Sequence, residues 1–302
     1  MDTPEPSLTV EAQAKVNLTL EVLGKRPDGY HALRSIVVPV SLSDTVTLTR
    51  TVAQVALSVS AGPGVGLPAI GPAERNLAVR AARLLQARYR VAAGARIHIH
   101  KRIPIGGGLG GGSADAAAAI RGLDRLWGLG LTRGEMMAAG AELGSDVPAL
   151  AHGGAVLMEG RGEAVTALLP EETGAEARGG FWLVIANPGV VCPTGEIFKR
   201  WKPGLTPGPG LLHNMRSFVR TGQAAAAAGA LFNGLQEGVF EAYPEVARAA
   251  ARLEAAGCLG VLLSGSGASV FGLVRGEAHG REVLQRLGEG LWSVLARTCP
   301  VV

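Results

Sequence analysis

The glycine-rich segment at residues 104–117 is the part of this chain whose residue types most clearly point to chemistry. Six of the seven residues from Gly106 to Gly112 are glycine, and an alanine-rich helical pattern follows directly. Glycine loses the most backbone entropy on folding and has no side chain to bury, so a hydrophobic core gains nothing from such a run. The run does let backbone N–H groups approach a phosphate, and the start of the next helix adds free N–H groups and a positive dipole end. The segment therefore predicts a phosphate site.

Two common phosphate loops do not fit this segment. A Walker A loop needs a lysine before its Ser or Thr, but here Gly112 stands directly before Ser113. A Rossmann fingerprint matches formally, but a run so rich in glycine matches almost automatically, and the nearest suitable acid, Asp124, is expected inside a helix. Protein kinases are excluded as well, because their His-Arg-Asp and Asp-Phe-Gly signatures do not occur.

Three segments in order along the chain resemble the motifs of the GHMP kinases, a family of small-molecule kinases. The first is Ala12-Gln-Ala-Lys-Val-Asn-Leu-Thr-Leu, the second is the glycine-rich segment from Pro104, and the third is Leu263-Ser-Gly-Ser-Gly-Ala-Ser. The resemblance implies a two-domain α+β fold. Residues 1–163 would form an N-terminal ATP-binding domain and residues 164–302 a C-terminal domain that contributes to substrate binding.

The resemblance also implies roles for individual residues in an ATP- and Mg²⁺-dependent phosphoryl transfer. Asp146 would take the proton of the acceptor hydroxyl, with Lys15 beside it. Ser113 would contact phosphate or Mg²⁺, since Ala114 replaces a second Ser common at that place. The residues implied for ATP and its phosphates are Pro104, Gly106, Gly107, Gly108, Leu109, Gly110, Gly111, Gly112, Ser113, Asn76 and Lys101.

The segment Asp28-Gly-Tyr-His resembles one branch of the family, the isoprenoid-pathway kinases whose alcohol substrate carries a cytidine group. Tyr30 and Phe198 would stack on the flat cytosine and His31 would bind its polar edge, although Phe198 equally suits core packing. The residues implied for substrate are Asn17, Tyr30, His31, Phe198, Gly265, Ser266 and Gly267. The alternatives are a homoserine- or mevalonate-type kinase of the same family, or a non-catalytic binding protein with this fold.

The elements that must position these residues follow from hydrophobic periodicity and turn signals. Alternation predicts strands over residues 8–23, 35–48, 96–101 and 181–186. Helical spacing predicts helices over 76–89, 114–127, 132–143, 222–232 and 244–256, and residues 259–295 suggest strand, glycine turn, strand and helix. The Glu159–Glu163 stretch is expected to be a surface hairpin. Strands and helices without strict βαβ alternation favour an α+β fold.

The composition of the chain limits which binding partners and cellular locations are expected. The 302 residues carry a net charge of +4 and show no basic run with interleaved aromatics, so nucleic acid is not expected. Three cysteines without metal or redox spacing fit a reducing cytoplasm. The uncharged stretch 255–274 has Ser-Gly-Ser-Gly at its centre, which favours strands and a turn over a membrane span. His98 and His100 share a strand face without a third ligand, so no metal site is expected there. Monomer and homodimer both remain open.

Overall fold

The computed structural model describes residues 6–67, 72–168, 180–204, 207 and 210–299, and these form two compact units. The first unit comprises the chain up to Ala14, Leu42–Ile105 and Gly110–His152. The second comprises Lys15–Ser41, Gly106–Leu109 and the described residues from Gly153 onward. The chain thus passes between the units several times, and the domain boundary expected after residue 163 stays a prediction.

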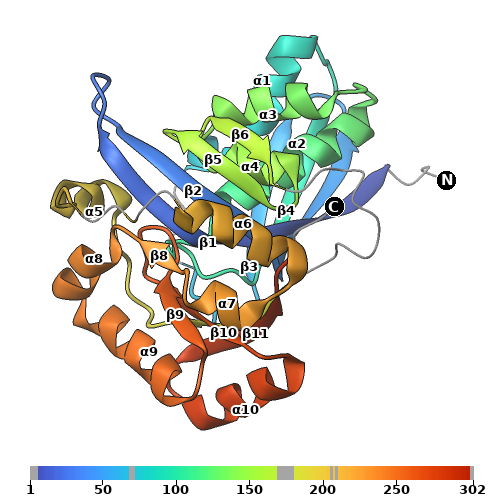
Figure 1. Cartoon of the computed structure of the whole chain (residues 1–302). Helices are drawn as coiled ribbons and strands as arrows, with labels where there is room; N and C mark the ends of the chain where they lie inside the picture. Colours follow the sequence, from blue (N-terminus) through green and yellow to red (C-terminus); the bar gives the residue numbers. More distant parts are fainter. Residues whose placement is uncertain (1–5, 68–71, 169–179, 205–206, 208–209, 300–302) are drawn as a thin grey trace. The chain divides into compact units, whose positions relative to one another are not determined.

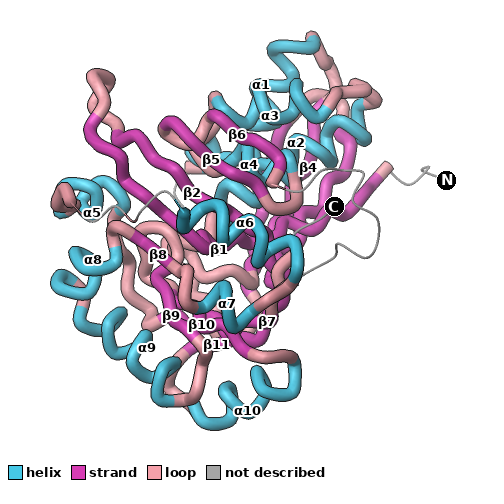
Figure 2. The backbone as a smooth tube through the Cα atoms, viewed as in Figure 1, coloured by secondary structure: helices cyan, strands magenta, loops and turns pink. Residues whose placement is uncertain are grey.

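The first unit is a sheet with helices packed on it (Figures 1 and 2). Its strands are β3 (Val55–Ala61), β4 (Gly94–Lys101), and parts of the long strands β1 (Ser7–Lys25) and β2 (His31–Thr51). β3 pairs parallel with β4, and β4 pairs antiparallel with β2. The helical elements are η1 (Ala73–Arg75), α1 (Leu77–Tyr89), α2 (Gly111–Trp127), α3 (Arg133–Ala141) and α4 (Val147–His152).

The core of this unit explains the alanine-rich composition of α2. Leu48, Ile97 and Ile99 on the sheet are fully buried in one cluster with Ala116–Ala119 and Ile120 of α2. A Cβ atom on Gly122 would lie only 2.3 Å from Cδ1 of Leu48, so small residues let this helix approach the sheet closely. The helices expected over 76–89, 114–127 and 132–143 and the strand over 96–101 are confirmed.

The second unit contains a four-stranded antiparallel sheet, in the order β11-β7-β10-β9. Its strands are β7 (Trp182–Asn187), β9 (Gly260–Leu263), β10 (Val270–Val274) and β11 (Trp292–Arg297). The unit also holds the β5–β6 hairpin (Val156–Gly160, Ala164–Ala167) on β2, and β8 (Phe232–Asn233) on β1. Its helices are α5 (Thr194–Arg200), α6 (Gly210–Thr221), α7 (Ala224–Ala228), α8 (Gln236–Ala242), α9 (Pro244–Ala255) and α10 (Glu277–Leu287). In Figure 1, α9 and α10 lie beside this sheet, with which they share a core.

Two expectations for this unit were wrong in detail. The helix expected over 222–232 is the short α7, because Gly222 with φ +68° breaks it from α6 and Phe232 already belongs to β8. The helix expected to reach Leu295 ends at Leu287, before Gly288 (φ +63°), and the chain returns to the sheet as β11. The strand, turn and strand expected within 255–274 are confirmed as β9 and β10. Of the described helices, none has the length and apolar character needed to cross a membrane.

Candidate active site

In the second unit, parts of the three motif segments identified in the sequence lie side by side, namely Lys15, Gly107–Leu109 and the turn from Ser264 to Ser269. The backbone N–H of Lys15 on β1 donates to the carbonyl of Leu109, 3.0 Å away. The turn between β9 and β10 binds the same loop, since Ser269 N–H donates to the Gly107 carbonyl at 2.9 Å and Ser264 Oγ to the Gly108 carbonyl at 3.1 Å. Segments that are far apart in the sequence are thus joined by direct hydrogen bonds.

Two glycines make this close approach possible. Gly108 has φ +74°, and a Cβ there would lie 2.2 Å from the Ser264 carbonyl oxygen. Gly265 has φ +58°, and its Cβ would lie 3.1 Å from both Lys15 Nζ and the Gly108 carbonyl oxygen. Both positions therefore need glycine for backbone conformation and for space.

Lys15 and Asn17 form the polar centre of this arrangement. Lys15 is 3% and Asn17 1% exposed, and Lys15 Nζ donates to Asn17 Oδ1 at 2.7 Å. They occupy alternate positions of β1, so their side chains share one face of the strand. The structure thus brings together the residues expected for catalysis and substrate binding on β1 with Gly265 of the third motif.

Asn233 supports the turn of the third motif and was not expected from the sequence. Its buried Nδ2 donates to the carbonyls of Leu263 at 2.9 Å and Gly265 at 2.8 Å, while its Oδ1 accepts from Leu235 N–H at 2.9 Å. The sequence signal at this position is Asn-Gly, which indicates only a turn. Ser266 at the tip of the turn is within 2.9 Å of the Thr194 hydroxyl on α5.

The aromatic residues expected for substrate lie in the second unit too. The rings of His31 and Phe198 stack with centroids 5.2 Å apart, and Trp201, which sequence reasoning missed, meets His31 edge-on at 5.8 Å. Burial, and then Lys25, lower the pKa of His31. Tyr30 is 54% exposed, with the Arg161 guanidinium 5.5 Å from its ring centroid. The structure thus pairs Phe198 with His31 and leaves one face of Tyr30 beside a cation.

Ser113, Asp146 and Asn76 lie in the first unit. Ser113 is in the first turn of α2, which begins after Gly110 without a side-chain cap. A Cβ on Gly144 would lie 3.9 Å from Ser113 Oγ, so the turn that carries Asp146 passes close to this hydroxyl. Asp146 directly precedes α4. Asn76 Oδ1 accepts from Ala78 N–H at 2.9 Å and caps α1, which is a structural task beside the expected nucleotide role.

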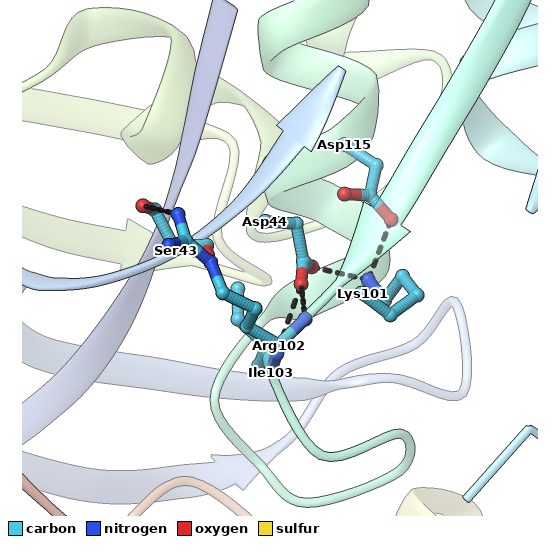
Figure 3. A network of polar contacts seen from close by, with 6 residues as sticks. All are labelled: Ser43, Asp44, Lys101, Arg102, Ile103 and Asp115. Carbon is cyan, nitrogen blue, oxygen red and sulfur yellow. Dashed lines mark hydrogen bonds and ion pairs between the residues drawn. The ribbon is translucent and has the colours of Figure 1, made fainter. Parts of the chain in front are cut away.

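Lys101 lies in a buried charged cluster at the foot of the glycine-rich loop (Figure 3). Its ammonium group contacts Asp44 and lies 2.7 Å from Asp115 Oδ2. Asp44 Oδ1 also accepts the backbone N–H groups of Arg102 at 2.5 Å and Ile103 at 2.9 Å. The cluster therefore joins the segment before the loop to the helix after it. A nucleotide contact of Lys101 stays a prediction.

Two carboxylates around one ammonium group leave a negative charge to be neutralised in this cluster. Burial and the charge of Asp44 raise the pKa of Asp115 to about 7, although Lys101 opposes the shift. Burial lowers the pKa of Lys101, but the two carboxylates outweigh it and the net direction is upward. Asp115 Oδ1 has no hydrogen-bond partner among the described residues. A proton on Asp115 is the simplest way to balance the charge.

Comparisons with known proteins identify the family of this chain. The model of the GHMP kinase N-terminal domain matches residues 76–154, and the model of the GHMP kinase C-terminal domain matches residues 211–291. The chain belongs to the GHMP kinase family. The expected α+β fold and the expectation of a small-molecule kinase are thereby confirmed.

Several relatives of this GHMP kinase carry one enzyme name. A protein of Symbiobacterium thermophilum named 4-diphosphocytidyl-2-C-methyl-D-erythritol kinase is 40% identical over 285 residues, which cover 93% of this chain and 95% of the relative. A protein of the same name from Pelotomaculum thermopropionicum is 40% identical over 280 residues, or 92% of this chain and 93% of the relative.

Two solved structures are similar to this kinase along almost its whole length. The crystal structure of 4-(cytidine 5'-diphospho)-2C-methyl-D-erythritol kinase matches with a TM-score of 0.78 and 30% identity, covering 96% of this chain and 99% of that one. Homoserine kinase from Cytophaga hutchinsonii matches with a TM-score of 0.71 but only 18% identity, covering 99% of this chain and 96% of that one, so it supports the fold alone.

Proposed function

We propose that this kinase transfers the γ-phosphoryl group of ATP to the 2-hydroxyl of 4-diphosphocytidyl-2-C-methyl-D-erythritol. The observation that carries the proposal is the 40% identity, over more than nine-tenths of the chain, to relatives named for this activity. The segment Asp28-Gly-Tyr-His, followed by the His31–Phe198 stack, supports the same substrate class, because a cytosine needs flat apolar faces and a polar edge contact.

Asp146 is proposed to accept the proton of the substrate hydroxyl. A carboxylate is a much weaker base than an alkoxide, so it cannot remove this proton before the reaction begins. In a loose, metaphosphate-like transition state the hydroxyl oxygen becomes acidic as it bonds to phosphorus, and the proton moves late. Lys15 is proposed to hold negative charge on the transferred group, and its buried contact with Asn17 limits the positions that its ammonium can take.

The glycine-rich loop and Ser113 are proposed to hold the phosphates and Mg²⁺. The described residues contain no group of three or more His, Cys, Asp or Glu side chains arranged as a metal site. Mg²⁺ suits this setting, since it takes oxygen ligands and often needs only one or two from the protein beside those of phosphate. Ser113 would supply one such oxygen, and the bound ion would neutralise charge on the β- and γ-phosphates.

For the base, we propose that the cytosine stacks between Tyr30 and Phe198 while His31 binds its edge. Burial lowers the pKa of His31 and so favours the neutral ring, in which one nitrogen can accept from the cytosine amino group. The three cysteines, which share no metal or redox spacing, suit a cytoplasmic location.

A coupled assay of ADP release with three alcohols tests the proposal. We expect turnover with the cytidylyl substrate and little with homoserine or mevalonate. Asp146→Asn should lower kcat by orders of magnitude with nearly unchanged ATP affinity, and Tyr30→Ala should raise KM for the cytidylyl substrate. Preferential turnover of homoserine or mevalonate would assign the chain to another branch of the family. No ATP consumption with any alcohol would leave a binding protein.

A further inference from the structure

The face of β1 that carries Lys15 is polar although it is buried. Lys15, Asn17, Thr19 and Glu21 occupy alternate positions and are each at most 3% exposed. The residues between them, such as Leu18 and Leu20, are apolar and equally buried. A buried polar side chain is costly unless it is hydrogen-bonded, so the partners of this face decide how it is arranged.

A chain of hydrogen bonds leads from Lys15 through Asn17 to Ser35 on β2. Lys15 Nζ donates to Asn17 Oδ1 at 2.7 Å, and Asn17 Nδ2 donates to Ser35 Oγ at 2.8 Å. Ser35 Oγ in turn donates to the backbone carbonyl of Thr19 at 2.5 Å. Ser35 is fully buried, so water does not compete for its hydroxyl.

The Lys15 ammonium and the Thr19 carbonyl, at the two ends of this series of hydrogen bonds, determine which group donates in each bond. A carbonyl oxygen only accepts, so Ser35 must give its single hydroxyl proton to Thr19 and can only accept from Asn17. Asn17 must then turn its NH₂ group to Ser35 and its carbonyl oxygen to Lys15. A lysine ammonium has only donors, so the flipped amide would set two donor groups 2.7 Å apart.

We propose that Ser35 is a positioning residue that fixes the orientation of the Asn17 amide and, through it, the place of the Lys15 ammonium group. The proposal rests on the proposed function, because it assigns Lys15 and Asn17 to the reaction. Ser35 itself is not proposed to contact the substrate hydroxyl or the transferred phosphoryl group. It acts by presenting an acceptor, and never a donor, to Asn17.

Ser35→Ala removes the acceptor of the Asn17 NH₂ group, so the amide is then held only by its bond to Lys15 and can move from its position. We expect kcat for the alcohol to fall about 10- to 100-fold, the range seen when a hydrogen-bond partner that orients a metal ligand is removed. KM for ATP should stay within about 2-fold of wild type. Ser35→Thr keeps the hydroxyl and should restore most of the activity. Should the alanine variant not fold, Ser35→Cys, a weak hydrogen-bonding group of similar size, carries the same test.

Thr19→Val is the matched control on the same strand face. Thr19 is also fully buried, but its Oγ1 accepts from the backbone N–H of Ile36 at 3.0 Å and takes no part in the chain through Asn17. We expect this variant to lose thermal stability and keep kcat. A drop in kcat equal to that of Ser35→Ala would mean that any buried hydroxyl loss has this effect, and would overturn the proposal.

Two readouts separate positioning from general damage and from failure of the proposed function. In an Asn17→Ala background, Ser35→Ala should cost nothing further in kcat, because its partner is already gone; additive losses would refute the proposal. The side-chain NH₂ signal of Asn17 in ¹⁵N NMR, assigned by its loss in Asn17→Ala, should shift in Ser35→Ala and stay in place in Thr19→Val. An unshifted signal would refute the proposal whatever alcohol the kinase uses, whereas the substrate assay alone tests the function.

Discussion

The buried cluster of Lys101, Asp44 and Asp115 predicts that two similar substitutions have different consequences. Asp115→Asn keeps an oxygen that can accept from Lys101 Nζ, and it places an NH₂ group where Asp115 Oδ1 has no partner among the described residues. The amide also has the charge of a protonated carboxyl group. We therefore expect Asp115→Asn to retain wild-type fold, ATP affinity and turnover.

The expected difference in stability between wild type and Asp115→Asn follows from the titration of Asp115. Its pKa is raised from 3.8 to about 7, first by burial, and one pKa unit corresponds to about 1.4 kcal/mol, so roughly 4 kcal/mol is linked to this proton. A carboxyl with a raised pKa stabilises the fold fully below pH 3.8, and this stability is lost as the pH rises through about 7. The asparagine variant has no such proton to lose.

Thermal melts of wild type and Asp115→Asn between pH 4 and pH 8 measure this effect. The wild type should lose stability relative to the variant as the pH rises, by an amount on the order of 8 °C in Tm at about 2 °C per kcal/mol. A Tm difference that stays constant across this range would refute the assignment of the proton to Asp115.

Asp44→Asn is the contrasting variant. Asp44 Oδ1 is held by two backbone N–H groups, so an asparagine would turn its NH₂ toward the Lys101 ammonium and lose a charged hydrogen bond worth about 1–3 kcal/mol. Asp115 would then ionise to pair with Lys101. The double variant, Asp44→Asn with Asp115→Asn, leaves Lys101 buried without a carboxylate. It should lower the free energy of unfolding by about 3–5 kcal/mol. Equal destabilisation by the two single variants at pH 8 would contradict this reasoning.

Two further predictions concern the glycine-rich loop and the thiols. Gly108→Ala should abolish most activity, because its Cβ would lie 2.2 Å from the Ser264 carbonyl at φ +74°. Steady-state kinetics check this, and Gly276→Ala, outside the loop and with nothing within 4 Å of its Cβ, is the mild control. Cys192 and Cys258 should resist iodoacetamide at pH 8 in the folded kinase and react after denaturation, because burial raises their pKa values to about 11 and about 12. Labelling of either thiol in the folded protein at the rate of a free cysteine, followed by mass spectrometry, would count against this.

The sequence was sufficient for the elements with strong local signals. The helix at Leu77–Tyr89 has an Asn at its cap and apolar residues at helical spacing, and the strand at Gly94–Lys101 alternates cleanly. The sequence was insufficient where the local pattern of apolar residues and turn residues was weak. Helix α6 follows a stretch rich in Pro and Gly, and the sequence analysis predicted no helix there. Strand β11 exists because it pairs with β7, a partner more than a hundred residues earlier.

The candidate site shows the same division between local and long-range information. Motif residues such as Lys15 and Gly108 could be found because their types and spacing resemble a family pattern. Asn233, Trp201 and Ser35 could not, because an isolated Asn, Trp or Ser has no spacing to distinguish it. Their roles depend on contacts made across the fold, such as the bond from Asn233 to the Gly265 carbonyl.

Polar side chains on a buried strand face are costly unless they are hydrogen-bonded, and this explains why those on β1 have partners within the protein. Each polar group on this face of β1 must be paired, since an unpaired one would cost about 1–3 kcal/mol. Asn17 is paired through Lys15 and Ser35, and Glu21 accepts from Arg34 at 2.8 Å. Because Asn17 is hydrogen-bonded on both sides within the protein, the position of the Lys15 ammonium is partly set before a substrate binds. A strand with such partners holds a side chain more firmly than a loop does, which is what phosphoryl transfer, a reaction governed by positioning and charge, requires.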